Sequence, residues 1–124
     1  MERIITIDYL RKNPNHIFVY GDNILHKGKK GAAALSGESN TYGLVTKKYP
    51  RGDNDAFYKC SEYEAIFKKE IDKLVEKILA NPDKIFLISK VGAGLANRFK
   101  IFEKIIEPNI KNILSKYSNV VFLW

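Results

Sequence analysis

A run of four apolar residues that ends at a glycine constrains the fold of this chain most. Residues 17–20 read Ile-Phe-Val-Tyr, and every one of them is β-branched or aromatic. Such a continuous run is typical of a strand buried on both faces, as in a parallel sheet. Gly21 ends the run, and Asp22 and Asn23 follow it. Because open α/β sheets gather ligands at the carboxyl ends of their strands, these polar residues indicate a candidate site there.

A glycine-bearing segment comes next and predicts an anionic ligand. Gly28 and Gly31 flank two lysines, and Gly31 precedes three alanines that favour a short helix. Glycine lets the backbone approach a ligand closely, and the free N–H groups of a helix start favour an anion.

The same arrangement occurs a second time. Residues 85–88 form another apolar run, and residues 89–97, SKVGAGLAN, place Gly92 and Gly94 directly after it. A backbone of this composition can wrap closely round a ligand, although a tight turn is the alternative. Two such loops can flank one diphosphate.

The remaining elements complete an α/β pattern with a largely parallel sheet and helices on its faces. Ser61 and Glu64 are expected to cap the long helix, and Pro108 to lie at a kink or in the first turn of a second helical segment. No internal repeat is apparent. The expected elements are strands over residues 3–7, 41–46 and 120–124, a helical turn after Asp8 over 9–12, and helices over 61–80 and 102–117.

Composition sets limits on partners. The 124 residues suit a single domain over residues 1–124, and 21 basic against 14 acidic residues give a net charge of +7, which attracts phosphorylated ligands. The lysines are dispersed, without an arginine-rich arm or an RNA-recognition signature, which disfavours nucleic acid as a partner.

The lone Cys60 allows no internal disulfide and no cysteine zinc cluster, and no metal or cofactor is expected. The first ten residues lack the apolar core of a signal peptide, and no run of about 18 apolar residues occurs. These features predict a soluble cytoplasmic protein that does not associate with membranes.

Two familiar phosphate motifs do not fit. Residues 28–31 are not followed by the Gly-Lys-Ser/Thr of a Walker A loop. The segment VGAGLAN approaches the dinucleotide fingerprint, but Asn97 occupies its last small position and too little chain follows for a second nucleotide-binding half.

Four segments in order resemble small macro-domain-like proteins of bacteriophage and prophage type: VYGDN, HKGKKGAAAL, VTKKYP and ISKVGAGLAN. The resemblance covers residues 16–50 and 85–124. It departs from the family pattern at Val45, where proline is usual, and in residues 36–40, which lack an aromatic. It implies a three-layer macro-like domain with a mostly parallel or mixed central sheet flanked by helices.

The resemblance also implies that an ADP-ribose-type nucleotide binds between the two glycine loops. The ligand-binding residues implied are Gly21, Asp22, Asn23, His26, Gly28, Gly31, Ala32, Thr46, Val91, Gly92, Ala93, Gly94 and Leu95.

Two functions follow from this site. The first is binding without turnover, as in a phage protein that sequesters a cyclic ADP-ribose immune signal in the host cytoplasm. It is favoured because the motif segments show no close carboxylate–histidine or nucleophile–base pair.

The alternative is an ADP-ribosyl hydrolase acting on protein, nucleic acid or a metabolite. Asn23 would orient the distal ribose, Asp22 or Asp53 would position a water, and Lys47 would stabilise charge. His26 would contact phosphate or act as an acid. Against these roles, Asp22 and Asn23 could simply cap a turn, and Lys47, Asp53 and His26 could be solvated loop residues.

Overall fold

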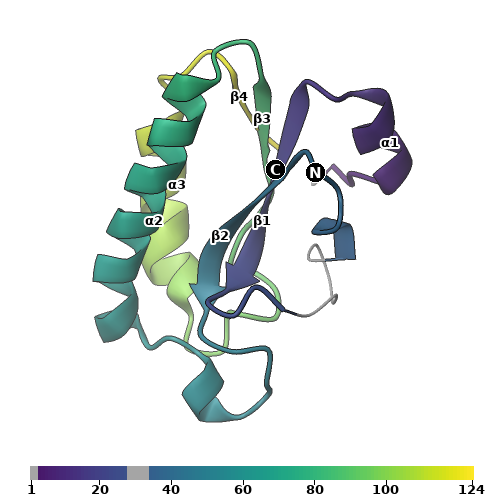
Figure 1. The fold of residues 1–124 in the computed structure, drawn as a ribbon. Coiled ribbons are helices and arrows are strands. Elements are labelled where there is room, and N and C mark those ends of the chain that lie inside the picture. The colour runs from purple at the N-terminus through teal and green to yellow at the C-terminus, as the bar shows by residue number, and fades with distance from the viewer. Residues whose placement is uncertain (1–2, 28–33) are drawn as a thin grey trace.

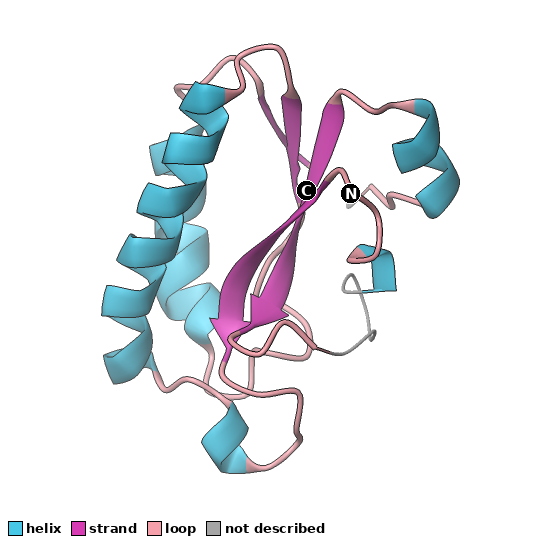
Figure 2. Ribbon diagram, in the orientation of Figure 1, coloured by secondary structure: helices cyan, strands magenta, loops and turns pink. Residues whose placement is uncertain are grey.

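The sheet has four strands, all parallel. In the computed structural model, which describes residues 3–27 and 34–124, the strand order is β2-β1-β3-β4. Figure 1 shows this sheet between its helices, and Figure 2 shows the same view by secondary structure. The strands are β1 (His16–Asn23), β2 (Thr41–Lys47), β3 (Ile85–Ile88) and β4 (Val120–Phe122).

Helices cover both faces of the sheet and make three layers. The long helix α2 and the helix α3 lie on one face, and α1 lies on the other (Figure 1). The expected α/β fold with a parallel sheet flanked by helices is therefore confirmed. The helical elements are α1 (Ile7–Lys12), η2 (Asn54–Ala56), α2 (Cys60–Ala80), the π-helical η3 (Phe102–Ile106) and α3 (Glu107–Leu114).

Strand β1 contributes to a core on each of its faces. Ile17 and Val19 belong to the larger core, which α2, η3 and α3 cover. Phe18 and Tyr20 belong to the smaller core on the α1 side. The strand is continuously apolar because both of its faces are buried.

The amino-terminal segment differs from the prediction. Residues 3–6 form no strand, although Arg3 N donates to Leu123 O at 2.8 Å. Thr6, not Asp8, caps α1, because its backbone is extended and its hydroxyl accepts from Tyr9 N at 3.1 Å.

Two helix boundaries were predicted with different success. Helix α2 begins at Cys60 after Lys59, so the expected cap at Ser61 is wrong. Glu62 accepts from Lys59 N at 3.0 Å and from Lys48 Nζ at 2.7 Å, which anchors this end. Pro108 lies in the first turn of α3, as expected.

The structure reveals a repeat that the sequence did not. Helices α1 and α2 are each followed by an asparagine at the C-cap, Asn13 (φ −129°, ψ 69°) and Asn81 (φ −131°, ψ 64°), and a proline follows each. Each asparagine amide donates to the carbonyl four residues earlier, at Tyr9 (2.8 Å) and Lys77 (2.9 Å).

A second pair of asparagines fastens the edge strands to these turns. Asn40, just before β2, has its carbonyl oxygen bonded to Phe18 N at 3.0 Å, and Asn119, just before β4, is bonded in the same way to Phe86 N at 2.8 Å. Each donates through Nδ2 to three carbonyls of the turn beside it. These are Leu10, Asn13 and His16 for Asn40, and Ile78, Asn81 and Lys84 for Asn119. We call each arrangement an asparagine latch.

The two latches occupy equivalent positions in the two halves of the sheet. Strand β2 lies outside β1, and β4 lies outside β3, while the preceding helices α1 and α2 lie on opposite faces. An approximate two-fold axis, parallel to the strands and between β1 and β3, therefore relates the two halves.

Candidate functional site

The carboxyl ends of β1 and β3 form a topological switch point. The chain leaves β1 toward β2 on one side, and it leaves β3 toward β4 on the other. Open α/β sheets bind ligands in the crevice where such connections diverge. The second predicted glycine loop begins here beside β1, since a Cβ built on Gly21 in β1 would lie 3.6 Å from Gly92 N. Of the loop after β1, residues 24–27 are described.

The glycines at this edge have different roles. A Cβ on Gly21 would approach Thr46 Oγ1 to 3.0 Å, and one on Gly92 would approach Ile106 Cδ1 to 2.5 Å. Gly92 also has φ +82°, which favours glycine. Packing within the protein therefore accounts for Gly21 and Gly92. A Cβ on Gly94 would meet nothing within 4 Å, so there is open space in front of this residue.

Thr46 fills the space between β1 and the loop after β3. The β1–β2 register passes from Asp22↔Val45 to Asn23↔Lys47, so Thr46 has no partner in β1. Such a bulge re-aims a side chain. Thr46 is 2% exposed and packs beside Gly21 and Gly92, so its side chain separates β1 from the loop after β3.

Asp22 and His26 form a close pair. Asp22 Oδ2 lies 2.6 Å from His26 Nδ1, and Asp22 Oδ1 accepts from Asn23 N at 2.8 Å. The Asp22 side chain is 6% exposed, whereas that of His26 is 69% exposed. The prediction that no close carboxylate–histidine pair exists is wrong. His26 reaches back because its backbone is left-handed (φ 54°), which the sequence spacing did not indicate.

The Asp22 carboxylate is held from several sides. A Cβ on Gly43 in the neighbouring strand would lie 2.5 Å from Asp22 Oδ2, so this glycine leaves the space that the carboxylate occupies. Burial, and then the charge of Asp22 and a hydrogen bond to it, raise the pKa of the Tyr20 hydroxyl above its ordinary value. Tyr20 is therefore a protonated neighbour of the carboxylate.

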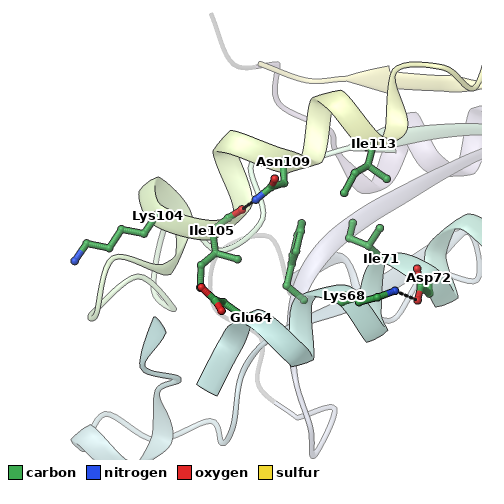
Figure 3. A pocket seen from close by; sticks show the side chains of 9 residues that line it. Glu64, Lys68, Ile71, Asp72, Lys104, Ile105, Asn109 and Ile113 are labelled. Atoms are coloured by element: carbon green, nitrogen blue, oxygen red, sulfur yellow. Dashed lines mark hydrogen bonds and ion pairs between the residues drawn. The ribbon is translucent and has the colours of Figure 1, made fainter. Parts of the chain in front are cut away.

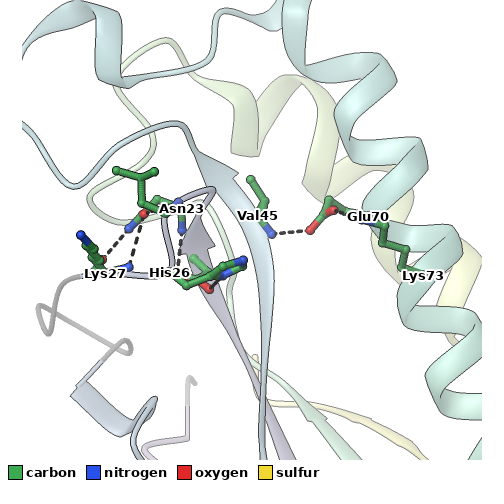
Figure 4. A network of polar contacts seen from close by, with 8 residues as sticks. Asn23, His26, Lys27, Val45, Glu70 and Lys73 are labelled. Atoms are coloured by element: carbon green, nitrogen blue, oxygen red, sulfur yellow. Dashed lines mark hydrogen bonds and ion pairs between the residues drawn. The ribbon is translucent and has the colours of Figure 1, made fainter.

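Asn23 organises the turn after β1 (Figure 4). Its Nδ2 donates to Lys27 O at 2.6 Å, and its Oδ1 accepts from Leu25 N at 3.0 Å. Both ends of the amide are thus engaged within the loop, as the turn-capping alternative expected.

Two cations bind one aromatic ring beside the site. Lys47 Nζ lies 4.6 Å and Arg98 Cζ 4.2 Å from the centre of the Phe57 ring. Arg98 also donates to Gly52 O at 2.7 Å and Asn54 Oδ1 at 3.0 Å. The basic loop after β2 is therefore fastened to the loop after β3. Sequence reasoning missed Arg98, because its role depends on a partner far along the chain.

The remaining residues that were predicted for the site lie in different environments. Asp53 forms an exposed ion pair with Arg51 at 3.2 Å. Val91 is buried in the larger core, and Ala93 packs against that core. Leu95 is 62% exposed. Gly28, Gly31 and Ala32 lie outside the described residues.

A separate groove of about 480 Å³ lies between α2 and the η3–α3 segment (Figure 3). Its rim carries both signs of charge, and Lys68 Nζ bonds Asp72 Oδ2 at 3.1 Å along the α2 side of it. A rim of mixed charge does not favour a strongly anionic ligand. The lining residues are Glu64, Phe67, Lys68, Ile71, Asp72, Lys104, Ile105, Asn109 and Ile113.

Comparison with known proteins places the chain in a family. A model described as a family of unknown function, DUF7831, matches residues 1–100. The chain belongs to the DUF7831 family. The DUF7831 match includes β1, β2, β3 and both loops at the switch point. No curated protein and no solved structure matches the chain.

Two further features are absent from the described residues. Within residues 3–27 and 34–124, no helix is long and apolar enough to cross a membrane. The same part of the chain holds no group of three or more histidine, cysteine and acidic residues placed to bind a metal ion.

Proposed function

We propose that this DUF7831 protein binds an ADP-ribose-type nucleotide at the switch point, between the loop after β1 and the loop after β3. The observation that carries the proposal is the close approach of the loop after β3 to β1, at Gly92 and Gly21, on the edge where parallel sheets bind ligands. The open space at Gly94 leaves room for a ligand against the backbone.

Charge and apolar exposure support a nucleotide over a bare phosphate. The chain has a net charge of +7, and Lys47 and Arg98 lie on Phe57 beside the loops. Ile24 (44% exposed), Leu25 (48%) and Leu95 belong to the two loops and present apolar surface. Binding sites for cofactors combine apolar walls with a few polar groups, which suits a base and sugar attached to phosphates.

The resemblance to macro-domain-like phage proteins narrows the nucleotide to the ADP-ribose type and favours the host cytoplasm as the place of action. Capture of a cyclic ADP-ribose signal without turnover is the first biological role that this implies. Its supporting argument was the lack of a carboxylate–histidine pair, and the contact between Asp22 and His26 removes that argument.

A thermal-shift series tests the proposal. ADP-ribose, cyclic ADP-ribose, NAD and ATP are each added at millimolar concentration, and we expect an ADP-ribose-type ligand to raise the Tm. A ligand that binds only the folded state stabilises it by about 2.7 kcal/mol at 100 times its Kd. No shift with any of the four would contradict the proposal.

Gly94→Val tests where the ligand lies. We expect this variant to fold with an unchanged Tm and to lose the ligand-induced shift, because the new side chain would enter the open space. Gly52→Val is the matched control, since a Cβ there also meets nothing within 4 Å. Equal ligand-induced shifts in the two variants would place the ligand elsewhere.

A further inference from the structure

We propose that Asp22 and His26 form a catalytic dyad in which His26 Nε2 is the general base for hydrolysis at C1 of the distal ribose. This inference rests on the proposed nucleotide site and decides the fate of the bound molecule. It starts from the contact of 2.6 Å between Asp22 Oδ2 and His26 Nδ1.

The contact fixes the role of each ring nitrogen. An ionised carboxylate can only accept, so His26 Nδ1 carries the proton in this hydrogen bond. In the neutral ring Nε2 then holds the lone pair. Because the side chain is 69% exposed, a water or a ligand can reach this nitrogen.

Asp22 is built in as a positioning residue. Its carboxylate is almost fully buried, accepts from Asn23 N, and occupies space that the absence of a side chain at Gly43 provides. A fixed carboxylate orients an imidazole and stabilises the imidazolium that forms during proton transfer.

The backbone conformation of His26 is a further observation in support of the dyad. Its φ of 54° is uncommon for a residue other than glycine, although histidine adopts it more often than most side chains do. Such backbone conformations cluster at functional sites. Holding a histidine here places an imidazole on a buried carboxylate at the switch point.

The second histidine provides an internal comparison. His16 Nδ1 also has one partner, the Tyr9 hydroxyl at 2.7 Å, but that partner is neutral. His16 is the first residue of β1, at the opposite end of the strand from the switch point. It can therefore serve as the control histidine.

The reaction needs one water and no other reactant. Nε2 takes a proton from the water, and the water oxygen forms a bond to C1 of the distal ribose. The bond from C1 to the leaving group breaks, and its electron pair stays with the leaving group. The imidazolium then returns the proton to a leaving group that departs as an anion, or to solvent where the group departs neutral, as nicotinamide does from NAD. With cyclic ADP-ribose the C1–N bond to adenine breaks, and ADP-ribose is the product.

The experiment follows two readouts on the same samples. The full chain is incubated separately with cyclic ADP-ribose and NAD, and ADP-ribose is quantified by chromatography. The Tm shift caused by added ADP-ribose is measured in parallel. The variants are His26→Gln, His26→Ala with and without free imidazole, Asp22→Asn and His16→Gln.

We expect turnover of at least one of the two nucleotides by the unchanged chain. His26→Gln and Asp22→Asn should each lower the rate about 100-fold or more, the usual contribution of a general base. Free imidazole should partly restore His26→Ala, which a purely structural role would not allow. His16→Gln should react at the original rate.

Failure of the proposed dyad and failure of the proposed nucleotide site give different results. If ADP-ribose raises the Tm but both nucleotides are recovered intact, the dyad is overturned and the nucleotide site stands as a capture site. Turnover by His26→Gln at the original rate would also overturn the dyad. If no nucleotide changes the Tm and none is hydrolysed, the proposed function itself fails.

Discussion

Gly43 shows that the lack of a side chain at one position can determine where another side chain lies. It lies in β2 opposite Tyr20 and leaves the space for the Asp22 carboxylate in the neighbouring strand. In the sequence this glycine only weakens a strand prediction, because glycine is a poor strand residue. Its reason becomes visible when the two strands are paired.

We predict that Gly43→Ala destabilises the protein by about 1–3 kcal/mol, the usual cost of overpacking. The added carbon would lie 2.5 Å from Asp22 Oδ2 and 2.9 Å from Asp22 Cβ, so the carboxylate would have to move. Urea unfolding measures the change. Gly52→Ala is the control and should leave the unfolding midpoint nearly unchanged, since its Cβ meets nothing. Equal midpoints for both variants would contradict the prediction.

The Asp22–His26 pair shows why the candidate site was only partly predictable. Asp22 was selected because it follows a buried run, which is local information. The pair depends on a left-handed backbone at His26, and the buried carboxylate and the turn around Asn23 determine that conformation. No periodicity in the sequence encodes it.

Side chains of helix α2 form hydrogen bonds with the free edge of β2. Glu70 Oε1 accepts from Val45 N at 2.7 Å, and the Tyr63 hydroxyl donates to Val45 O at 2.5 Å. Edge strands present unpaired backbone groups that invite other chains. Side chains of α2 satisfy two of these groups, and Lys73 Nζ lies 3.7 Å from the second oxygen of Glu70.

Tyr63 makes this contact sensitive to alkaline pH. Burial raises the pKa of its hydroxyl far above the ordinary value, and the charge of Glu70 adds to the effect. A tyrosine whose pKa is raised in the folded state contributes stability below the unfolded pKa of about 10, and this contribution is lost as pH rises above it.

We therefore predict that Tyr63→Phe is less stable than the original chain at pH 8, by about 1 kcal/mol for one lost hydrogen bond. The difference should shrink or change sign at pH 11, because phenylalanine cannot ionise. Chemical unfolding at both pH values measures it. Tyr49→Phe is the control, at a half-buried tyrosine of the loop after β2 whose ring Arg51 covers, and it should show no such change. A constant difference for Tyr63→Phe at both pH values would count against the assignment.

Elements were predictable where a strong local pattern agrees with the tertiary fold. The apolar runs of β1 and β3 and the periodicity of α2 are such patterns, and their strands and helix were found. Residues 3–7 have strand-forming side chains but no strand, and Ile4 is 89% exposed. Strand propensity acts only where a neighbouring strand and a core are available.

The two asparagine latches fix the amino end of the sheet. Each joins the end of a helix, the start of an inner strand and the start of an edge strand. The carboxyl end carries the loops of the candidate site instead. The stabilising latches and the candidate site thus lie at opposite ends of one sheet.

We predict that Asn40→Ala and Asn119→Ala each cost about 1–3 kcal/mol, because carbonyls of the turn lose their donor. The latches share no hydrogen-bond partner, so the double variant should show the sum within about 0.5 kcal/mol. Asn112→Ala is the control, since its amide makes one exposed bond to Pro108 O at 3.2 Å. Thermal unfolding measures all four. A negligible change in either single variant would show that water replaces the latch.

The latches also amount to a rule that a protein designer can apply. The turns read Asn-Pro-Asn-His and Asn-Pro-Asp-Lys, so they share two residues and still make matching hydrogen bonds. The transferable module is a helix that ends in Asn-Pro, two variable residues, a strand, and one asparagine placed just before the parallel neighbour. Grafted onto another parallel sheet, it specifies which strand lies next to which, and it does so through amide geometry, leaving the choice of core residues open.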